Sequence, residues 1–156
     1  MIHLSEIENF SSKLGVLKET VEKDYCLTWL LIALSSLKKE SEDIIFYGGT
    51  AIKKIYFPDY RFSEDLDFIG LGGLKADRIL NLWERLYAVI KDKANINFST
   101  ERETVERQET RLQFFIVYDG FPELEGLNKR VKVDFAFDFH LSQKPVLKRL
   151  YCGYSD

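Results

Sequence analysis

Hydrophobic and polar residues recur along this chain with two different periods, which together predict helices in the first part and strands in the last. Helical spacing of apolar residues predicts helices over residues 4–14, 19–39, 50–56 and 74–93. Short apolar or alternating runs predict strands over residues 44–47, 64–69, 96–105, 112–118 and 130–140. This order of elements indicates an α+β fold with a mixed or mostly antiparallel sheet flanked by helices.

The predicted strand over residues 130–140 shows the clearest alternation. Its apolar face would carry Val131, Val133, Phe135, Phe137 and Phe139. Its polar face would carry Lys132, Asp134, Ala136, Asp138 and His140. Alternate side chains of a strand point to opposite faces, so the five apolar residues are predicted to be core and the others to lie on the far side of the sheet.

A glycine pair, Gly48-Gly49, separates a short apolar strand from the short helix that Pro58 ends. A strand-to-helix turn of this kind offers backbone N–H groups to a phosphate. Thr50 is a candidate both for capping the helix and for contacting that phosphate. The simpler alternative is a turn that needs glycine only for its backbone conformation.

Asp65 and Asp67 would share one face of the next strand, with Leu66 and Phe68 turned to the core. Two neighbouring carboxylates repel each other unless a cation lies between them, and Mg²⁺ prefers oxygen ligands. A phosphate-binding turn beside metal-binding carboxylates indicates phosphoryl or nucleotidyl transfer. The alternative is a solvated strand face, but the combination of features favours the chemical interpretation.

A third carboxylate is needed from a neighbouring strand, and Asp134 is the candidate, with Asp138 on the same predicted face as the second choice. Asp134 would act as the base toward an attacking hydroxyl, or else belong to an exposed strand face without a chemical role. Lys132 shares its predicted face and would either offset the Asp134 charge or contact substrate.

The segment before the aspartates supplies two further candidates. Arg61 would neutralise a triphosphate, or else form a surface ion pair with Asp59 or Glu64. Ser63 would bind a phosphate, or else hydrogen-bond within its own loop.

Other basic residues are predicted to be surface groups. Lys53 and Lys54 fit the solvent-facing side of the short helix. Arg111, Lys129 and Arg130 would form either an RNA-binding edge or a charged surface, and the surrounding glutamates favour the second.

Composition bounds these interpretations without choosing among them. A length of 156 residues suits one domain, and 46% hydrophobic and 30% charged residues are an ordinary globular balance. The net charge of -3 argues against a generally basic nucleic-acid coat. Two distant cysteines and no signal-like or membrane-length apolar run indicate a reduced, cytoplasmic setting. Walker A, Gly-x-Ser-x-Gly and dinucleotide-binding motifs do not occur.

Four short motifs resemble one family. Residues 48–51 read Gly-Gly-Thr-Ala and residues 61–67 read Arg-Phe-Ser-Glu-Asp-Leu-Asp. Residues 22–25, Glu-Lys-Asp-Tyr, and residues 132–134, Lys-Val-Asp, accompany them. The pattern is similar to the nucleotidyltransferase superfamily, and more closely to the AbiEii/AbiGii-type toxin family.

The resemblance implies a single nucleotidyltransferase-like domain over residues 1–156, with a helical part at 1–40 and a catalytic core at 44–140. It implies transfer of a nucleotide from an NTP to RNA, especially tRNA, by the toxin of a type IV toxin–antitoxin or abortive-infection system, with a cognate antitoxin as partner. It assigns Mg²⁺ or Mn²⁺ to Asp65, Asp67 and Asp134. The expected phosphate-binding residues are Gly48, Gly49, Thr50, Arg61, Ser63 and Lys132.

Family members continue past the position of Asp156 into a helical region, so the sequence is expected to be a fragment or a shortened member. Two alternatives therefore stay open. One is a catalytically incomplete module that binds a nucleotide or a partner, and the other is transfer of the nucleotide to protein.

Overall fold

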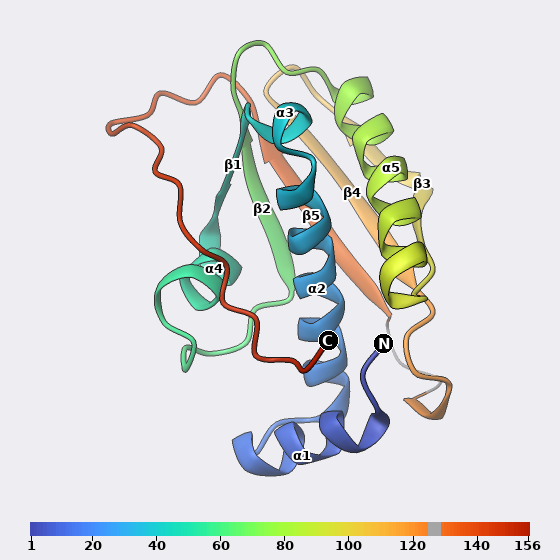
Figure 1. Cartoon of the computed structure of the whole chain (residues 1–156). Coiled ribbons are helices and arrows are strands. Elements are labelled where there is room, and N and C mark those ends of the chain that lie inside the picture. The colour runs from blue at the N-terminus through green and yellow to red at the C-terminus, as the bar shows by residue number, and fades with distance from the viewer. Residues whose placement is uncertain (125–128) are drawn as a thin grey trace.

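A five-stranded sheet with the order β1-β2-β5-β4-β3 forms the centre of the computed structural model, which describes residues 1–124 and 129–156 (Figure 1). Its strands are β1 Ile44–Tyr47, β2 Asp65–Gly70, β3 Phe98–Arg107, β4 Arg111–Tyr118 and β5 Arg130–Ala136. The β2–β5 pair is parallel and the other neighbouring pairs are antiparallel. The predicted α+β class with a mixed, mostly antiparallel sheet is confirmed.

Helices cover one face of this sheet. The α-helices are α1 Leu4–Leu14, α2 Lys18–Ser36, α3 Lys38–Ser41, α4 Gly48–Ala51 and α5 Ala76–Ala94, and two short turns are the π-helix η1 Ile52–Tyr56 and the 3₁₀-helix η2 Pro122–Leu124. Figure 1 shows α2 and α5 side by side against the sheet. On α5, the buried Ile79, Leu86 and Ile90 recur at helical spacing, and Trp83 meets Phe135 edge-on.

Strands β4 and β5 bury every second residue beneath these helices, and the first part of β2 follows the same alternation. Leu66 and Phe68 of β2 and Val133 of β5 are almost fully buried, whereas Asp67 and Asp134 lie between them on the opposite face. We call this opposite side, which carries the alternate polar residues, the polar face. The period of two read from the sequence therefore separates core from polar face correctly in the central strands.

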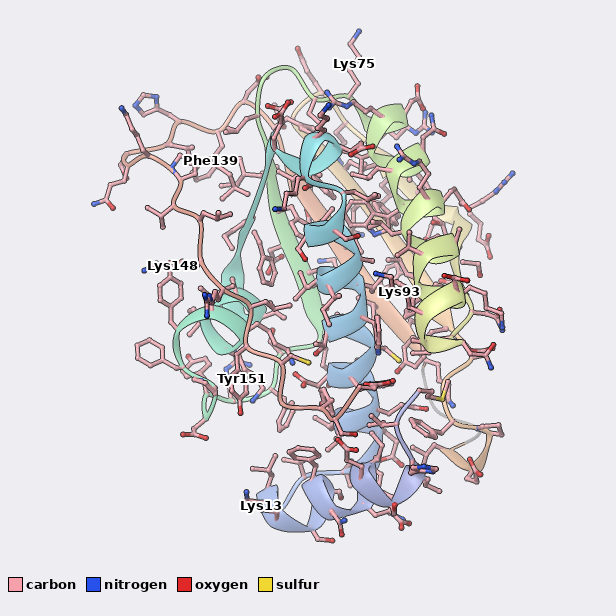
Figure 2. The ribbon with its side chains drawn as sticks, in the orientation of Figure 1. Lys13, Lys75, Lys93, Phe139, Lys148 and Tyr151 are labelled. Atoms are coloured by element: carbon pink, nitrogen blue, oxygen red, sulfur yellow. The ribbon has the colours of Figure 1, made fainter. Side chains whose placement is uncertain are left out.

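Strand β5 ends at Ala136, four residues before the predicted end at His140. Ala136 is the last residue paired with both neighbouring strands, opposite Arg111 and Ile69, so the chain beyond it has no strand to follow. Asp138 adopts a left-handed backbone conformation with φ of 55°. Phe139, predicted to be core, is 55% exposed and projects from the chain that follows (Figure 2).

The last twenty residues form no helix or strand, and they pass β1 and α4 before ending near the N-terminus (Figure 1). The backbone N–H of Tyr151 donates to the carbonyl of Lys54 at 2.7 Å. Tyr154 contacts the ring of Tyr25 edge-on, and the Met1 amino group lies 3.3 Å from Asp156. Both ends of the chain are therefore attached to α2.

Among the helices in the described part of the chain, none combines the length and the apolar character that a membrane crossing requires.

Candidate active site

The glycine pair makes the closest approach to the aspartate strand. Gly48 has a φ of 80°, and a Cβ added there would lie 2.2 Å from Oδ2 of Asp67. A Cβ on Gly49 would lie 3.0 Å from the Ser63 hydroxyl oxygen. Glycine at position 48 is therefore required twice, for its backbone conformation and for the space that the carboxylate occupies.

Thr50 joins the glycine turn to the start of β2. Its side chain is fully buried, and its hydroxyl donates to the backbone carbonyl of Asp65 at 2.5 Å. The N-cap of α4 is Tyr47, which makes no side-chain capping bond, so the prediction that Thr50 caps the helix is wrong. A phosphate contact by Thr50 stays a prediction, and with the hydroxyl already engaged it would use the backbone N–H.

The three predicted carboxylates gather on the polar face of adjacent strands. Asp67 of β2 is the register partner of Asp134 of β5, and Asp65 is the partner of Lys132. Neighbouring strands are about 4.8 Å apart, so these four side chains share one small area. Burial, followed by the charges of Asp65 and Asp134, raises the pKa of Asp67 above its usual value.

Asp134 differs from Asp67 because a cation already holds it. Arg111 Nε donates to Asp134 Oδ1 at 2.8 Å, and Arg111 Nη2 donates to Oδ2. The Lys132 amino group lies 3.4 Å from the same Oδ2. The hydrogen bonds from Arg111 hold the pKa of the Asp134 carboxyl below its usual value.

The sequence interpretation of Arg111 as a surface charge missed this contact. The signal was present in the alternation of β4, where Arg111 and Gln113 take the face opposite the buried Leu112 and Phe114. Because Gln113 pairs with Asp134 in register, Arg111 is two residues away on the same face.

Tyr47 is a second residue at the site that sequence reasoning missed. It ends β1 directly opposite Asp67 and is 39% exposed. Partial burial, together with the charges of Asp67 and Asp134, raises the pKa of its hydroxyl. No pattern in the chain singled it out, because its place depends on the β1–β2 register.

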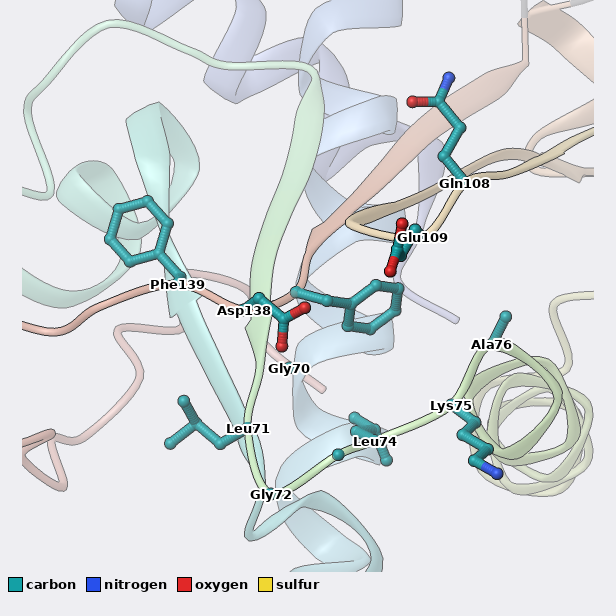
Figure 3. Close-up of a pocket in the computed structure, with 12 residues that line it drawn as sticks. Gly70, Leu71, Gly72, Leu74, Lys75, Ala76, Gln108, Glu109, Asp138 and Phe139 are labelled. Carbon is teal, nitrogen blue, oxygen red and sulfur yellow. The ribbon is translucent and has the colours of Figure 1, made fainter.

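Asp138, the second choice for a third carboxylate, lies elsewhere. It lines a cavity of about 480 Å³ where β2 ends at Gly70 and β5 has left the sheet (Figure 3). None of the three carboxylates at the site lines this cavity. The early end of β5 is the reason, because Asp138 no longer follows the strand alternation.

Lys53 stabilises the segment that carries Arg61 and Ser63 by hydrogen bonds to its backbone. The Lys53 amino group donates to the carbonyls of Pro58 at 2.9 Å and Tyr60 at 3.1 Å, and it lies 4.1 Å from the centre of the Phe62 ring. Burial lowers the pKa of this amino group.

Arg61 is exposed, and it forms no ion pair within residues 1–124 and 129–156. Its guanidinium lies 6.0 Å from the centre of the Tyr60 ring. The surface ion pair of Arg61 with Glu64, one of the alternatives for Arg61, does not form in the described residues. Glu64 Oε2 instead lies 2.7 Å from the Lys23 amino group. Phosphate binding by Arg61 and Ser63 stays a prediction.

Lys53 and Lys54 are buried, so the prediction that they face solvent is wrong. Lys54 is 3% exposed; its amino group donates to Asp24 Oδ2 at 2.6 Å and to the Thr28 hydroxyl at 2.8 Å. The physical reason is that the segment continues as the π-helix η1, which lies against α2 and leaves Ile52 and Tyr56 exposed instead.

Three consecutive charged residues on α2 connect the segments around the site. Glu22 accepts from the backbone N–H of Phe121 at 2.6 Å and lies 3.1 Å from the Lys129 amino group. Lys23 holds Glu64, the residue before β2, and Asp24 holds Lys54 of η1. The Glu-Lys-Asp run thus links α2 to the glycine-turn segment, to β2 and to the connection before β5.

The donor set at the site fits a hard divalent cation in part. Asp65 and Asp67 offer carboxylate oxygens on one face, and burial, followed by the charges of Asp65 and Asp134, raises the pKa of Asp67. Within the described residues, no three His, Cys, Asp or Glu side chains converge closely enough to enclose an ion. Asp134, the predicted third ligand, has its carboxylate bound to Arg111, and its role as a metal ligand stays a prediction.

Comparison with solved structures gives two similar proteins from Helicobacter pylori. The crystal structure of JHP933 has 19% sequence identity and a TM-score of 0.44, over 70% of this chain and 41% of that one. A second H. pylori protein, provisionally named a nucleotidyltransferase, has 19% identity and a TM-score of 0.43, over 69% and 42% of the two chains. This chain thus spans about two fifths of their length. No curated protein matches the sequence.

A family model described as "Nucleotidyl transferase AbiEii toxin, Type IV TA system" matches residues 29–156. The matched region contains the glycine turn and the strands that bear the three carboxylates. The match extends over most of the chain and agrees with the resemblance found in its motifs. The chain therefore belongs to the AbiEii nucleotidyl transferase toxin family.

Proposed function

We propose that this chain is a divalent-metal-dependent nucleotidyltransferase that transfers a nucleoside monophosphate from an NTP to an RNA acceptor, with tRNA foremost. The observation that carries the proposal is the group of three carboxylates, on β2 and β5, beside a glycine turn that only glycine can form. Family membership supports the reaction type and the role as a toxin with an antitoxin partner.

Asp65, Asp67 and Asp134 would hold Mg²⁺ or Mn²⁺. When bound, the cation would offset the negative charge of the triphosphate and the negative charge that develops during transfer. In the reaction, the acceptor hydroxyl oxygen forms a bond to the α-phosphorus while the bond to pyrophosphate breaks. The proton of that hydroxyl passes to Asp134, which faces the same side of the sheet as Asp67.

The triphosphate would lie against the glycine turn. Gly48, Gly49 and Thr50 contribute backbone N–H groups, and the Ser63 hydroxyl beside Gly49 contributes a further donor. Lys132 and Arg61 supply positive charge, Lys132 from the polar face and Arg61 from the segment braced by Lys53.

The test is transfer from each α-labelled NTP in turn, with total RNA and cell protein present and with Mg²⁺ added or chelated. Replacing Asp67 by Asn should lower transfer about 100-fold or more, because a neutral amide oxygen binds Mg²⁺ more weakly than a charged carboxylate does. Asp92→Asn on the exposed side of α5 is the matched control and should retain wild-type transfer.

Label on RNA that requires Asp67 and divalent metal supports the proposal and identifies the nucleotide. Label on protein instead would replace the RNA acceptor by a protein acceptor with the same chemistry. NTP binding without any label or released pyrophosphate would show that this chain alone is a binding module.

A further inference from the structure

Arg111 forms a bidentate ion pair with Asp134. Arg111 begins β4, and its Nε and Nη2 donate to the two different oxygens of Asp134, so both carboxylate oxygens are engaged. The Gln113 side-chain oxygen accepts from Nη2 at 3.0 Å and holds the guanidinium from the other side. Two alternate residues of β4, Arg111 and Gln113, thus orient the planar Arg111 guanidinium toward Asp134 of β5.

Both Asp134 oxygens are engaged in this arrangement, so a metal ion would compete with the guanidinium for them. A guanidinium fork matches a carboxylate in geometry and charge, so the pair is stronger than a single hydrogen bond. Asp134 has only 14% of its side chain exposed, which limits the water that competes for it, whereas Arg111 is 45% exposed and has room to move away. Asp67, its register partner, has no cationic side chain within ion-pair distance in the described residues.

We propose that Arg111 is a built-in counter-ion for Asp134, which a divalent cation must displace, so that Arg111 sets the metal affinity of the site. The inference rests on the proposed function in that the cation is the one used for nucleotide transfer. It explains why the three carboxylates do not converge on one point although the strands place them side by side. Arg111 is thus a positioning residue that acts through Asp134.

The experiment is a calorimetric titration of the full chain with Mn²⁺, without nucleotide. Arg111→Gln should lower the dissociation constant about fivefold, the effect expected when a partly exposed ion pair no longer competes. Arg111→Lys keeps the charge but loses the fork, so its effect should be smaller. The control is Arg107→Gln, which breaks an ion pair with Asp77 outside the site and should leave Mn²⁺ affinity unchanged.

A general loss of positive charge would also strengthen cation binding, and a double-mutant cycle separates the two causes. In an Asp134→Asn background, the Arg111→Gln change should have no effect, because Arg111 acts through that carboxylate. An equal gain in that background would overturn the proposal, as would unchanged or weaker Mn²⁺ binding by Arg111→Gln alone.

The outcome is distinguishable from failure of the proposed function. Wild-type Mn²⁺ binding that Arg111→Gln leaves unchanged overturns the role of Arg111 and leaves nucleotide transfer intact. Absence of Mn²⁺ binding in both proteins overturns the counter-ion proposal, and the labelled-NTP assay then decides separately whether the chain transfers nucleotide. Binding by the Arg111→Gln variant alone supports the counter-ion role in its strongest form. Thermal melting of each variant verifies that it is folded.

Discussion

The charged form of Asp67 destabilises the folded protein. Its carboxylate lies against Gly48, faces Asp134 on the next strand and follows Asp65 on its own strand. Burial and these two charges raise its pKa, so the folded protein holds the proton more tightly than the unfolded chain does. The stabilising contribution of Asp67 is therefore complete below its unfolded pKa and is lost as the pH rises through the folded pKa.

Replacing Asp67 by Asn should raise the melting temperature near neutral pH by about 2 °C, because the neutral amide removes the repulsion. The gain is small since the side chain is partly exposed and solvent screens the charges. Below about pH 4 the wild-type carboxyl is itself protonated and the difference should disappear. Thermal melts at both pH values test this, and a lower melting temperature near neutral pH would contradict it.

At the scale of elements, α2 acts as the support for the whole site. Within one turn its Glu22, Lys23 and Asp24 side chains reach the segment before β5, the residue before β2 and the π-helix after the glycine turn. The Asp24–Lys54 pair is the most enclosed of these, with side-chain exposures of 6% and 3%. A buried pair is costly to break because the remaining charge has no partner and no water.

Replacing Lys54 by Met should lower the free energy of unfolding by about 3–5 kcal/mol, since Asp24 is left buried without a cationic partner. The double variant Asp24→Leu with Lys54→Met should recover part of this loss, because no isolated charge remains. Lys18→Met breaks a pair with Glu8 in which both side chains are nearly half exposed, and it should cost less than about 1 kcal/mol. Urea unfolding measures all three, and a double variant no more stable than Lys54→Met alone would exclude the buried-charge explanation.

At the scale of the whole molecule, the two ends of the chain meet on α2, opposite the polar face of the sheet. Tyr154 is the central contact, because its hydroxyl donates to Asp24 at 2.7 Å and its ring meets Phe10 and Tyr25 edge-on. We therefore expect the C-terminal residues to unfold together with the helix that supports the site.

Tyr154→Phe should lower the free energy of unfolding by about 1.5–3 kcal/mol, the effect of losing one hydrogen bond to a charged group. Tyr154→Ala also removes the ring contacts and should cost about 3–5 kcal/mol. Tyr151→Phe is the comparison, because that side chain is half exposed (Figure 2) and its change should be close to neutral. Equal stability of wild type and Tyr154→Ala would show that the C-terminal segment is not part of the cooperative unit.

Much of the fold could be predicted from local patterns. The limits of α1 and of β1 agree with the sequence interpretation residue for residue, and α5 was displaced by only one or two residues. Periodicity predicts which side of a helix or strand is buried. It can be read from the sequence because it depends only on residues that are close together along the chain. It failed for residues 138–140, which continue the strand pattern in the sequence but pair with no strand of the described part of the chain, whereas Phe137 still packs against the core.

Some features of the candidate site could likewise be predicted from the sequence, and others could not. Asp65 and Asp67 were placed on one face by strand alternation alone, and the glycine pair marked the turn beside them. The burial of Lys54 and the grip of Arg111 on Asp134 were not predicted, because each depends on residues 30 and 23 positions away along the chain.

The sequence by itself determined the class of fold, the glycine turn, the aspartate strand and the family, since each of these is a local pattern of residue types. Only the tertiary structure decided which cation pairs with each carboxylate, which lysines are buried and where β5 ends. The physical reason is that ion pairing and burial depend on distances in space, which the register of the sheet and the packing of α2 establish.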